Sequence, residues 1–229
     1  MRPRRLTELG LLSLAAAIAL SLLAFVMPYI WSAAIVGANV GQPLLNSLHT
    51  VWIPVSGWLL NSGIVVFGLL GFAFVWRGRW EFGPENASRM GLTLLALVIA
   101  FAAYAAYALT GGILGYVSGV EFLRPWHALF HFTGAVFLGF ALYWILSNLP
   151  LHGSRPTAAV SYALGVAGAA LLLFATLGLR RAEALGVQGA GVGLSLASLV
   201  LWFVLCLWDV QGLRQRGTGL PAAAATRSS

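Results

Sequence analysis

Two histidines lie four residues apart in the segment Trp126-His-Ala-Leu-Phe-His131, and this spacing suits metal or proton chemistry. Residues four apart share one face of a helix, so both imidazoles would project from the same side, one turn apart. A third histidine, His49, precedes an apolar segment whose start we expect at the same end of the molecule. Three imidazoles with an open fourth position would satisfy a catalytic zinc ion.

The same histidines allow other interpretations. His49 and one of the fourth-segment pair could clamp a haem from opposite sides, because two histidines on one helix cannot both be axial ligands of one iron. A proton-sensing role is a third interpretation, since imidazole titrates near neutral pH. The simplest interpretation is structural, with each imidazole hydrogen-bonded at a membrane interface.

Other polar side chains are expected near these histidines. Four of them lie close in sequence and could act as supporting residues, acid or base: Asn46, Ser47, Glu121 and Arg124. Asn61 lies about ten residues into its apolar segment, where an amide must find an interhelical hydrogen bond or a ligand. We therefore predict a polar pocket in the outer leaflet, bounded by His49, Asn61, His127 and His131.

The elements that position these residues are apolar segments long enough to cross a membrane. Hydrophobic residues make up 60% of the 229, charged residues only 8%, and the mean hydropathy is +0.89. Such a composition excludes a soluble globular domain. We predict an all-α bundle of six transmembrane helices, at residues 9–29, 51–76, 90–110, 126–146, 158–179 and 189–208.

The basic residues indicate the orientation, because cytoplasmic loops retain an excess of positive charge. All 13 are arginines. Six crossings would place ten of them on the side of both termini: Arg2, Arg4, Arg5, Arg77, Arg79, Arg89, Arg155, Arg214, Arg216 and Arg227. Only Arg124, Arg180 and Arg181 would lie opposite. We expect both termini in the cytoplasm, and attribute the net charge of +7 to topology and anionic lipid rather than to nucleic acid.

The domain organisation predicted from these segments is simple. A single transmembrane domain would cover residues 1–209, with an uncleaved first helix, and residues 210–229 would form a disordered cytoplasmic tail. Cys206 would be a packing residue. Small-residue stripes should mark close helix contacts and offer faces for a membrane-protein partner or a homo-oligomer. The stripes are Gly57, Asn61, Ile64, Gly68 and Gly71; Ala135 and Gly139; Gly165 and Gly168; and Gly189, Gly193 and Ala197.

The segment Ser56-Gly-Trp-Leu-Leu-Asn-Ser-Gly-Ile-Val-Val-Phe-Gly-Leu-Leu70, followed by His127-Ala-Leu-Phe-His-Phe, resembles an uncharacterised prokaryotic membrane family, domain of unknown function 998. Members of that family are similar in length and have about six helices. The resemblance implies this fold and singles out Asn61 and His127, but implies almost nothing about function.

The pair His127 and His131 also resembles the His-x-x-x-His motif of the alkaline ceramidase and progestin-receptor-like membrane hydrolases. In that superfamily three histidines hold zinc, and His49 could stand in for the third. This sequence departs from the pattern: it has six segments rather than seven, no aspartate before Asp209, and Asn46-Ser-Leu-His49 in place of Ser-x-x-x-His.

We therefore expect a multi-pass protein of the cytoplasmic membrane that is not catalytic and whose polar pocket takes a lipid or another small ligand. Motifs for nucleophilic, nucleotide and dithiol chemistry are missing from the sequence, as are paired carboxylates in the apolar segments. A zinc-dependent hydrolase of lipid amides is the first alternative, and a haem-binding redox subunit is the second.

Overall fold

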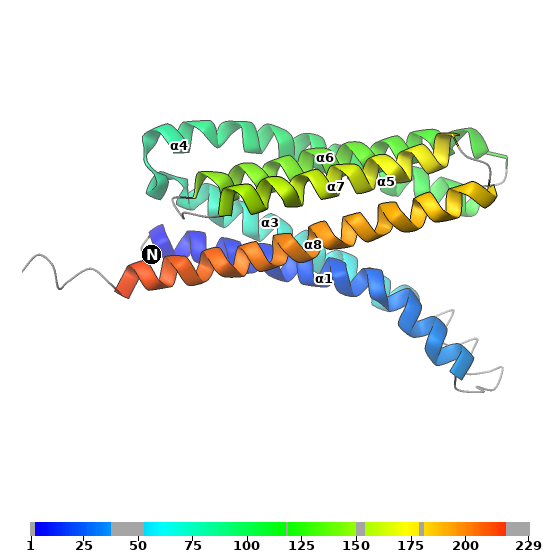
Figure 1. Ribbon diagram of the computed structural model, residues 1–229, viewed down its shortest axis with the longest axis horizontal. Coiled ribbons are helices and arrows are strands. Elements are labelled where there is room, and N and C mark those ends of the chain that lie inside the picture. Colours follow the sequence, from blue (N-terminus) through cyan, green and yellow to red (C-terminus); the bar gives the residue numbers. More distant parts are fainter. Residues whose placement is uncertain (1–2, 38–52, 118, 150–153, 179–180, 219–229) are drawn as a thin grey trace, which may run out of the picture. The chain divides into compact units, whose positions relative to one another are not determined.

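The computed structural model describes residues 3–37, 53–117, 119–149, 154–178 and 181–218, and all regular structure in these ranges is helical (Figure 1). Six of the described helices are long and apolar enough to cross a membrane. They are α1 (Pro3–Gly37), α3 (Ile53–Gly78), α5 (Gly91–Tyr116), α6 (Arg124–Asn148), α7 (Ser154–Gly178) and α8 (Arg181–Thr218). The 25 residues of α6 span about 38 Å, more than a hydrocarbon core of about 30 Å. The predicted six-helix membrane class is confirmed.

Short elements connect the long helices. The 3-10 helix η2 (Arg79–Phe82) and the helix α4 (Pro84–Arg89) follow α3, and the 3-10 helix η3 (Glu121–Leu123) precedes α6. Gly83 and Gly119 have φ angles of 87° and 80°, in the left-handed region that only glycine adopts readily. These two glycines allow the chain to turn after η2 and before η3.

The chain divides into two compact units, Met1–Gly78 with Leu213–Ser229, and Arg79–Gly212. In the first unit, α1 packs antiparallel to α3. A Cβ atom added at Gly10 would lie 2.6 Å from Val75 Cγ2, and one added at Gly71 would lie 2.7 Å from Leu14 Cγ. These distances leave no room for a side chain, so the two glycines set the approach of the helices. Glu8 also forms an ion pair with Arg214 in this unit.

In the second unit, α5, α6 and α7 pack in chain order. Gly134 of α6 faces the ring of Tyr104 on α5, which would lie 3.0 Å from an added Cβ atom. On the other side of α6, Gly139 faces the Tyr162 ring of α7 at 3.0 Å, and the rings of Tyr143 and Tyr162 stack with centroids 5.9 Å apart. Each interface therefore seats an aromatic ring on a glycine.

The contact between α7 and α8 rests on hydrogen bonds as well as on small residues. Ser161 Oγ donates to Ser198 O at 3.0 Å, and Ser198 Oγ donates to Ser161 O at 2.7 Å. Both serines are buried. Near them, a Cβ atom added at Gly168 would lie 2.7 Å from the carbonyl oxygen of Gly191, so these backbones meet closely. Lipid tails offer no hydrogen-bond acceptor, so without these two bonds the serine hydroxyls would be left unpaired.

Two predictions about this fold need correction. Residues 210–218, expected to be disordered, are the end of α8, because Asp209, Val210 and Leu213 repeat a buried face at helical spacing and good helix formers surround them. The rest of the expected tail lies outside the described residues. Among the described residues, Gly57, Gly68, Gly189 and Gly193 have no atom within 4 Å of an added Cβ, so they do not mark close contacts there. The single domain over residues 1–209 stays a prediction.

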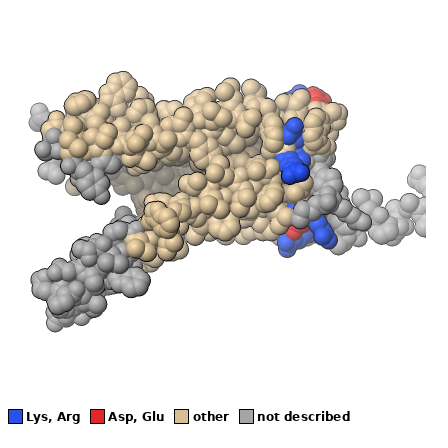
Figure 2. Space-filling model, turned by 180° about the vertical axis from the view of Figure 1, so that it is seen from behind, with Lys and Arg blue, Asp and Glu red and all other residues tan. Residues whose placement is uncertain are grey.

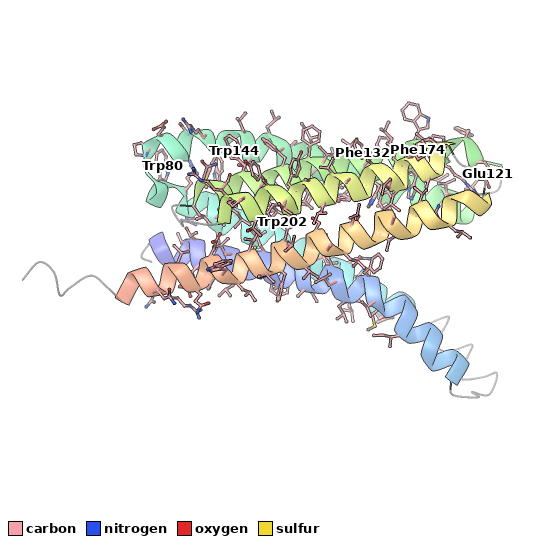
Figure 3. All side chains as sticks on the ribbon, in the orientation of Figure 1. Trp80, Glu121, Phe132, Trp144, Phe174 and Trp202 are labelled. Carbon is pink, nitrogen blue, oxygen red and sulfur yellow. The ribbon has the colours of Figure 1, made fainter. Side chains whose placement is uncertain are left out.

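Charged side chains lie at the helix ends. Figure 2 shows few charged atoms on the visible face, where most atoms belong to uncharged residues. In the second unit, η3 leads directly into α6. Glu121 lies at the start of this continuous segment and Trp144 lies near its other end (Figure 3). The sequence separation of 17 between His127 and Trp144 corresponds to about 26 Å along the helix axis. His127 and Trp144 are therefore separated by nearly the thickness of a hydrocarbon core.

Candidate functional site

The candidate site lies where the last turns of α5 meet the first turns of α6. Pro125 occupies the first turn of α6, where the missing backbone N–H costs nothing. This start places His127 in the first turn and His131 one turn further. We call the group formed by these two histidines with Tyr104, Tyr107 and Thr110 of α5 the imidazole–tyrosine cluster.

His127 lies against α5 on three sides. Its ring stacks on the Tyr107 ring, with centroids 4.1 Å apart and an interplanar angle of 18°. The ring also covers Gly111, where an added Cβ atom would lie 3.0 Å from Cε1. Its Nδ1 atom lies 3.0 Å from Thr110 Oγ1 and 3.1 Å from the carbonyl oxygen of Tyr107. Stacking, the glycine and two polar contacts together fix the orientation of this imidazole.

These contacts favour one tautomer of His127. The carbonyl oxygen of Tyr107 can only accept a hydrogen bond, so Nδ1 must carry the hydrogen that it donates. Thr110 Oγ1 lies 2.8 Å from the carbonyl oxygen of Ala106 and donates to it, which leaves its lone pairs free to accept from Nδ1. In the neutral ring, Nε2 is then the unprotonated nitrogen. His127 therefore offers Nε2 as a hydrogen-bond acceptor or as a metal ligand.

His131 lies beside the same tyrosines without a comparable anchor. Its ring is 5.1 Å from the Tyr107 ring and 6.3 Å from the Tyr104 ring, between centroids. The Nδ1 atom is buried and has no hydrogen-bond partner among the described residues. A buried, unsatisfied ring nitrogen costs free energy, and an ordered water or a bound ligand would satisfy it.

Glu121 and Arg124, predicted as supporting residues of the site, contact each other at the start of α6. The two side chains form an ion pair with each other across three residues, and both are exposed. Neither makes a hydrogen bond with His127 or His131 within the described part of the chain. An exposed pair of this kind contributes little to stability, so we see it as an interfacial pair at the start of α6.

Asn61 lies on α3 in the other compact unit, where its side chain is exposed and makes no hydrogen bond with the described residues. His49, Asn46 and Ser47 fall in residues 38–52, outside the described residues. The described residues contain no group of three or more His, Cys, Asp or Glu side chains that could hold a metal ion. The three-histidine zinc site thus stays a prediction that depends on His49.

Sequence analysis missed the α5 half of the cluster. Tyr104, Tyr107 and Thr110 repeat every three residues and Gly111 follows, so they share one face of an otherwise apolar helix. That stripe of polar and small residues was the available signal. Tyrosines near helix ends are also expected as interfacial anchors, so the stripe alone does not identify a site.

The chain was compared with known proteins. No protein-family model, curated protein or solved structure matches it. The chemistry of the site must therefore be argued from its own residues: one imidazole oriented with Nε2 as an acceptor, a second with a buried unsatisfied nitrogen, and two tyrosine rings beside them.

Proposed function

We propose that this multi-pass membrane protein is not catalytic and uses the imidazole–tyrosine cluster to bind a lipid or another small ligand. The observation that carries the proposal is the Nδ1 contact of His127 with the carbonyl oxygen of Tyr107. It prepares Nε2 as an acceptor before any ligand arrives, which lowers the cost of ordering the site on binding. The buried, unpartnered Nδ1 of His131 supports the same conclusion.

The ligand chemistry follows from what the cluster offers. An imidazole acceptor calls for a hydroxyl or amide hydrogen on the ligand, and tyrosine rings call for an apolar or planar group beside it. Exposed apolar side chains flank the cluster residues in sequence, including Leu109, Trp126 and Leu129. These features fit a molecule with one polar group and an apolar body, as membrane lipids have.

A zinc-dependent hydrolase of lipid amides is the second candidate, and one observation favours it. Zinc-bound histidines commonly donate their other ring N–H to a backbone carbonyl, as His127 does to Tyr107. Zinc would need His131 and a further ligand, for which His49 is the candidate from sequence. A haem-binding redox subunit would also need His49, opposite His127 or His131.

We place the protein in the cytoplasmic membrane of a prokaryote, with both termini in the cytoplasm. The support is the distribution of arginines between alternate helix ends and the resemblance to the prokaryotic family named above. Small-residue faces that lack close contacts among the described residues support a membrane-protein partner or a second copy of the chain.

Elemental analysis and visible absorption of the detergent-purified protein distinguish the candidates. We expect neither stoichiometric metal nor a Soret band, in wild type or in the double variant His127→Ala, His131→Ala. Near-stoichiometric zinc that is lost in the variant would replace our proposal with the hydrolase, and a Soret band would replace it with the redox subunit. Helicity and a monodisperse elution profile serve as controls for folding of the variant.

A further inference from the structure

The far end of α6 from the histidines carries a second cluster of polar and aromatic side chains. Trp144 Nε1 donates to the carbonyl oxygen of Arg89 at 3.1 Å, which joins α6 to the end of α4. Arg155 Nε donates to the carbonyl oxygen of Ser147 at 2.7 Å, which joins the start of α7 to the same turn. Arg89 and Arg155 are thereby both attached to the last turn of α6.

These contacts leave donors available on both guanidinium groups. The side chain of Arg155 is exposed, and its two terminal nitrogens make no hydrogen bond with the described residues. Arg89 uses one terminal nitrogen, Nη2, to contact Glu85 at 2.6 Å, and its side chain is 54% exposed. The fork of donors on a guanidinium matches the oxygens of a phosphate group.

Aromatic side chains place this end at the level of lipid headgroups. Trp80 is 64% exposed and lies at the same end as Trp144 (Figure 3), with the Arg79 guanidinium 5.0 Å from its ring centroid. Exposed tryptophans gather at the boundary between hydrocarbon and headgroups. The phosphates of anionic lipids lie at this depth and carry the complementary charge.

We propose that Arg89 and Arg155, which are both hydrogen-bonded to the end of α6, bind the phosphate of an anionic phospholipid in the adjacent leaflet. The occupant is a membrane lipid rather than a soluble anion, because the aromatic rings beside the arginines favour an attached acyl chain. The inference does not depend on the imidazole–tyrosine cluster, which lies about 26 Å away along α6.

The experiment is native mass spectrometry of the full-length protein with equal amounts of phosphatidylglycerol and phosphatidylcholine of identical acyl chains. We expect the wild type to retain phosphatidylglycerol preferentially. Arg89→Gln should lower that preference about fivefold, and adding Arg155→Gln should lower it further, to on the order of tenfold or more. Glu85→Gln should raise it, because a carboxylate beside the phosphate is removed.

Arg124→Gln is the matched control. Arg124, like Arg89, is exposed and pairs with a glutamate on its own side of the molecule, but it lies at the other end of α6. Its loss should change the preference less than twofold. An equal loss in the Arg89 and Arg124 variants, or no preference in the wild type, would overturn the proposal. If Arg155→Gln fails to fold, Arg89→Gln alone tests the proposal. This variant should fold, because the Arg89 guanidinium contacts only the exposed Glu85 among the described residues.

Discussion

At the scale of single residues, the orientation of His127 explains most of what the candidate site can do. A histidine at a membrane interface can present either ring nitrogen, and the backbone carbonyl of Tyr107 removes that ambiguity by accepting from Nδ1. Gly111 makes room for the ring, and Tyr107 stacks on it. The chemistry of His127 is thereby reduced to one available atom, Nε2.

The tautomer is directly measurable. In protein labelled with ¹⁵N-histidine, we expect the His127 ring to show a protonated Nδ1 and an unprotonated Nε2 at a pH where it is neutral. His127→Gln assigns the signal by its disappearance. A neutral His127 with its hydrogen on Nε2 would contradict the contact with Tyr107, and with it the reason for calling Nε2 an acceptor.

Sequence could predict half of the candidate site. His127 and His131 were found because ionisable residues are rare in this chain and a four-residue spacing places two of them on one helix face. The spacing could not show what the imidazoles touch. The partners Tyr107 and Thr110 come from another helix, and the contact that fixes the tautomer is made to a backbone atom, which carries no sequence signal.

At the scale of elements, close helix contacts are made where a glycine meets a side chain or a backbone. Gly71 of α3 faces Leu14 of α1, whereas Gly68, one turn earlier, has open space among the described residues. Lipid tails are as apolar as the helices, so packing and hydrogen bonds, rather than a hydrophobic drive, must hold the helices together. The two glycines therefore have different consequences for stability.

Alanine substitution at Gly71 and at Gly68 distinguishes the effect of helix packing on stability from the effect of helix propensity. Gly71→Ala would place Cβ 2.9 Å from the backbone nitrogen of Leu14, so the helices must move apart, and we expect a loss of about 1 to 3 kcal/mol in unfolding free energy. Gly68→Ala should be neutral or slightly stabilising, because alanine favours helix. Unfolding in mixed detergent micelles measures both. Equal effects at the two positions would contradict the α1–α3 contact.

The serine bonds between α7 and α8 give a second prediction at this scale. Ser161→Ala and Ser198→Ala each remove one interhelical bond, and we expect about 0.6 kcal/mol for each in the same unfolding assay. Ser195→Ala is the control, because Ser195 Oγ donates to the carbonyl oxygen of Gly191 within its own helix. A larger loss for Ser195 than for either buried serine would show that the paired bonds do not join the helices.

The existence of the helices was easier to predict than the faces they present. Six apolar segments were unmistakable from composition and length. The contact face of α8 was predicted at Gly189, Gly193 and Ala197, but Gly191, Ser195 and Ser198 face α7. Small residues occur on several sides of this helix, so spacing alone could not select one face.

At the scale of the whole molecule, the positions of the arginines between the apolar segments predict which helix ends lie on the same side of the membrane. The start of α5 and the end of α6 belong to one side, and the end of α5 and the start of α6 to the other. Six crossings would place ten of the 13 arginines on the side that includes the start of α5 and the end of α6. The expected cytoplasmic location of both termini follows from that bias.

Thiol labelling tests this topology. Cys206, the single cysteine, is buried, so Cys206→Ala provides a background without cysteine. In intact cells, a membrane-impermeant thiol reagent should label Glu121→Cys, which lies in the exposed η3, but not Ser88→Cys, which lies in the exposed part of α4. Permeabilised cells should show both labels. The reverse pattern would place the histidine end of α6 in the cytoplasm.

The central claim is that the imidazole–tyrosine cluster binds a small ligand, and the most direct test is to identify what the purified protein retains there. Organic extracts of wild type and of the His127→Ala, His131→Ala variant, purified in the same detergent, are compared by mass spectrometry. We predict one small molecule with an apolar body and a hydrogen-bond donor, near stoichiometric in wild type and depleted at least tenfold in the variant. Identical extracts from the two folded proteins would contradict the claim.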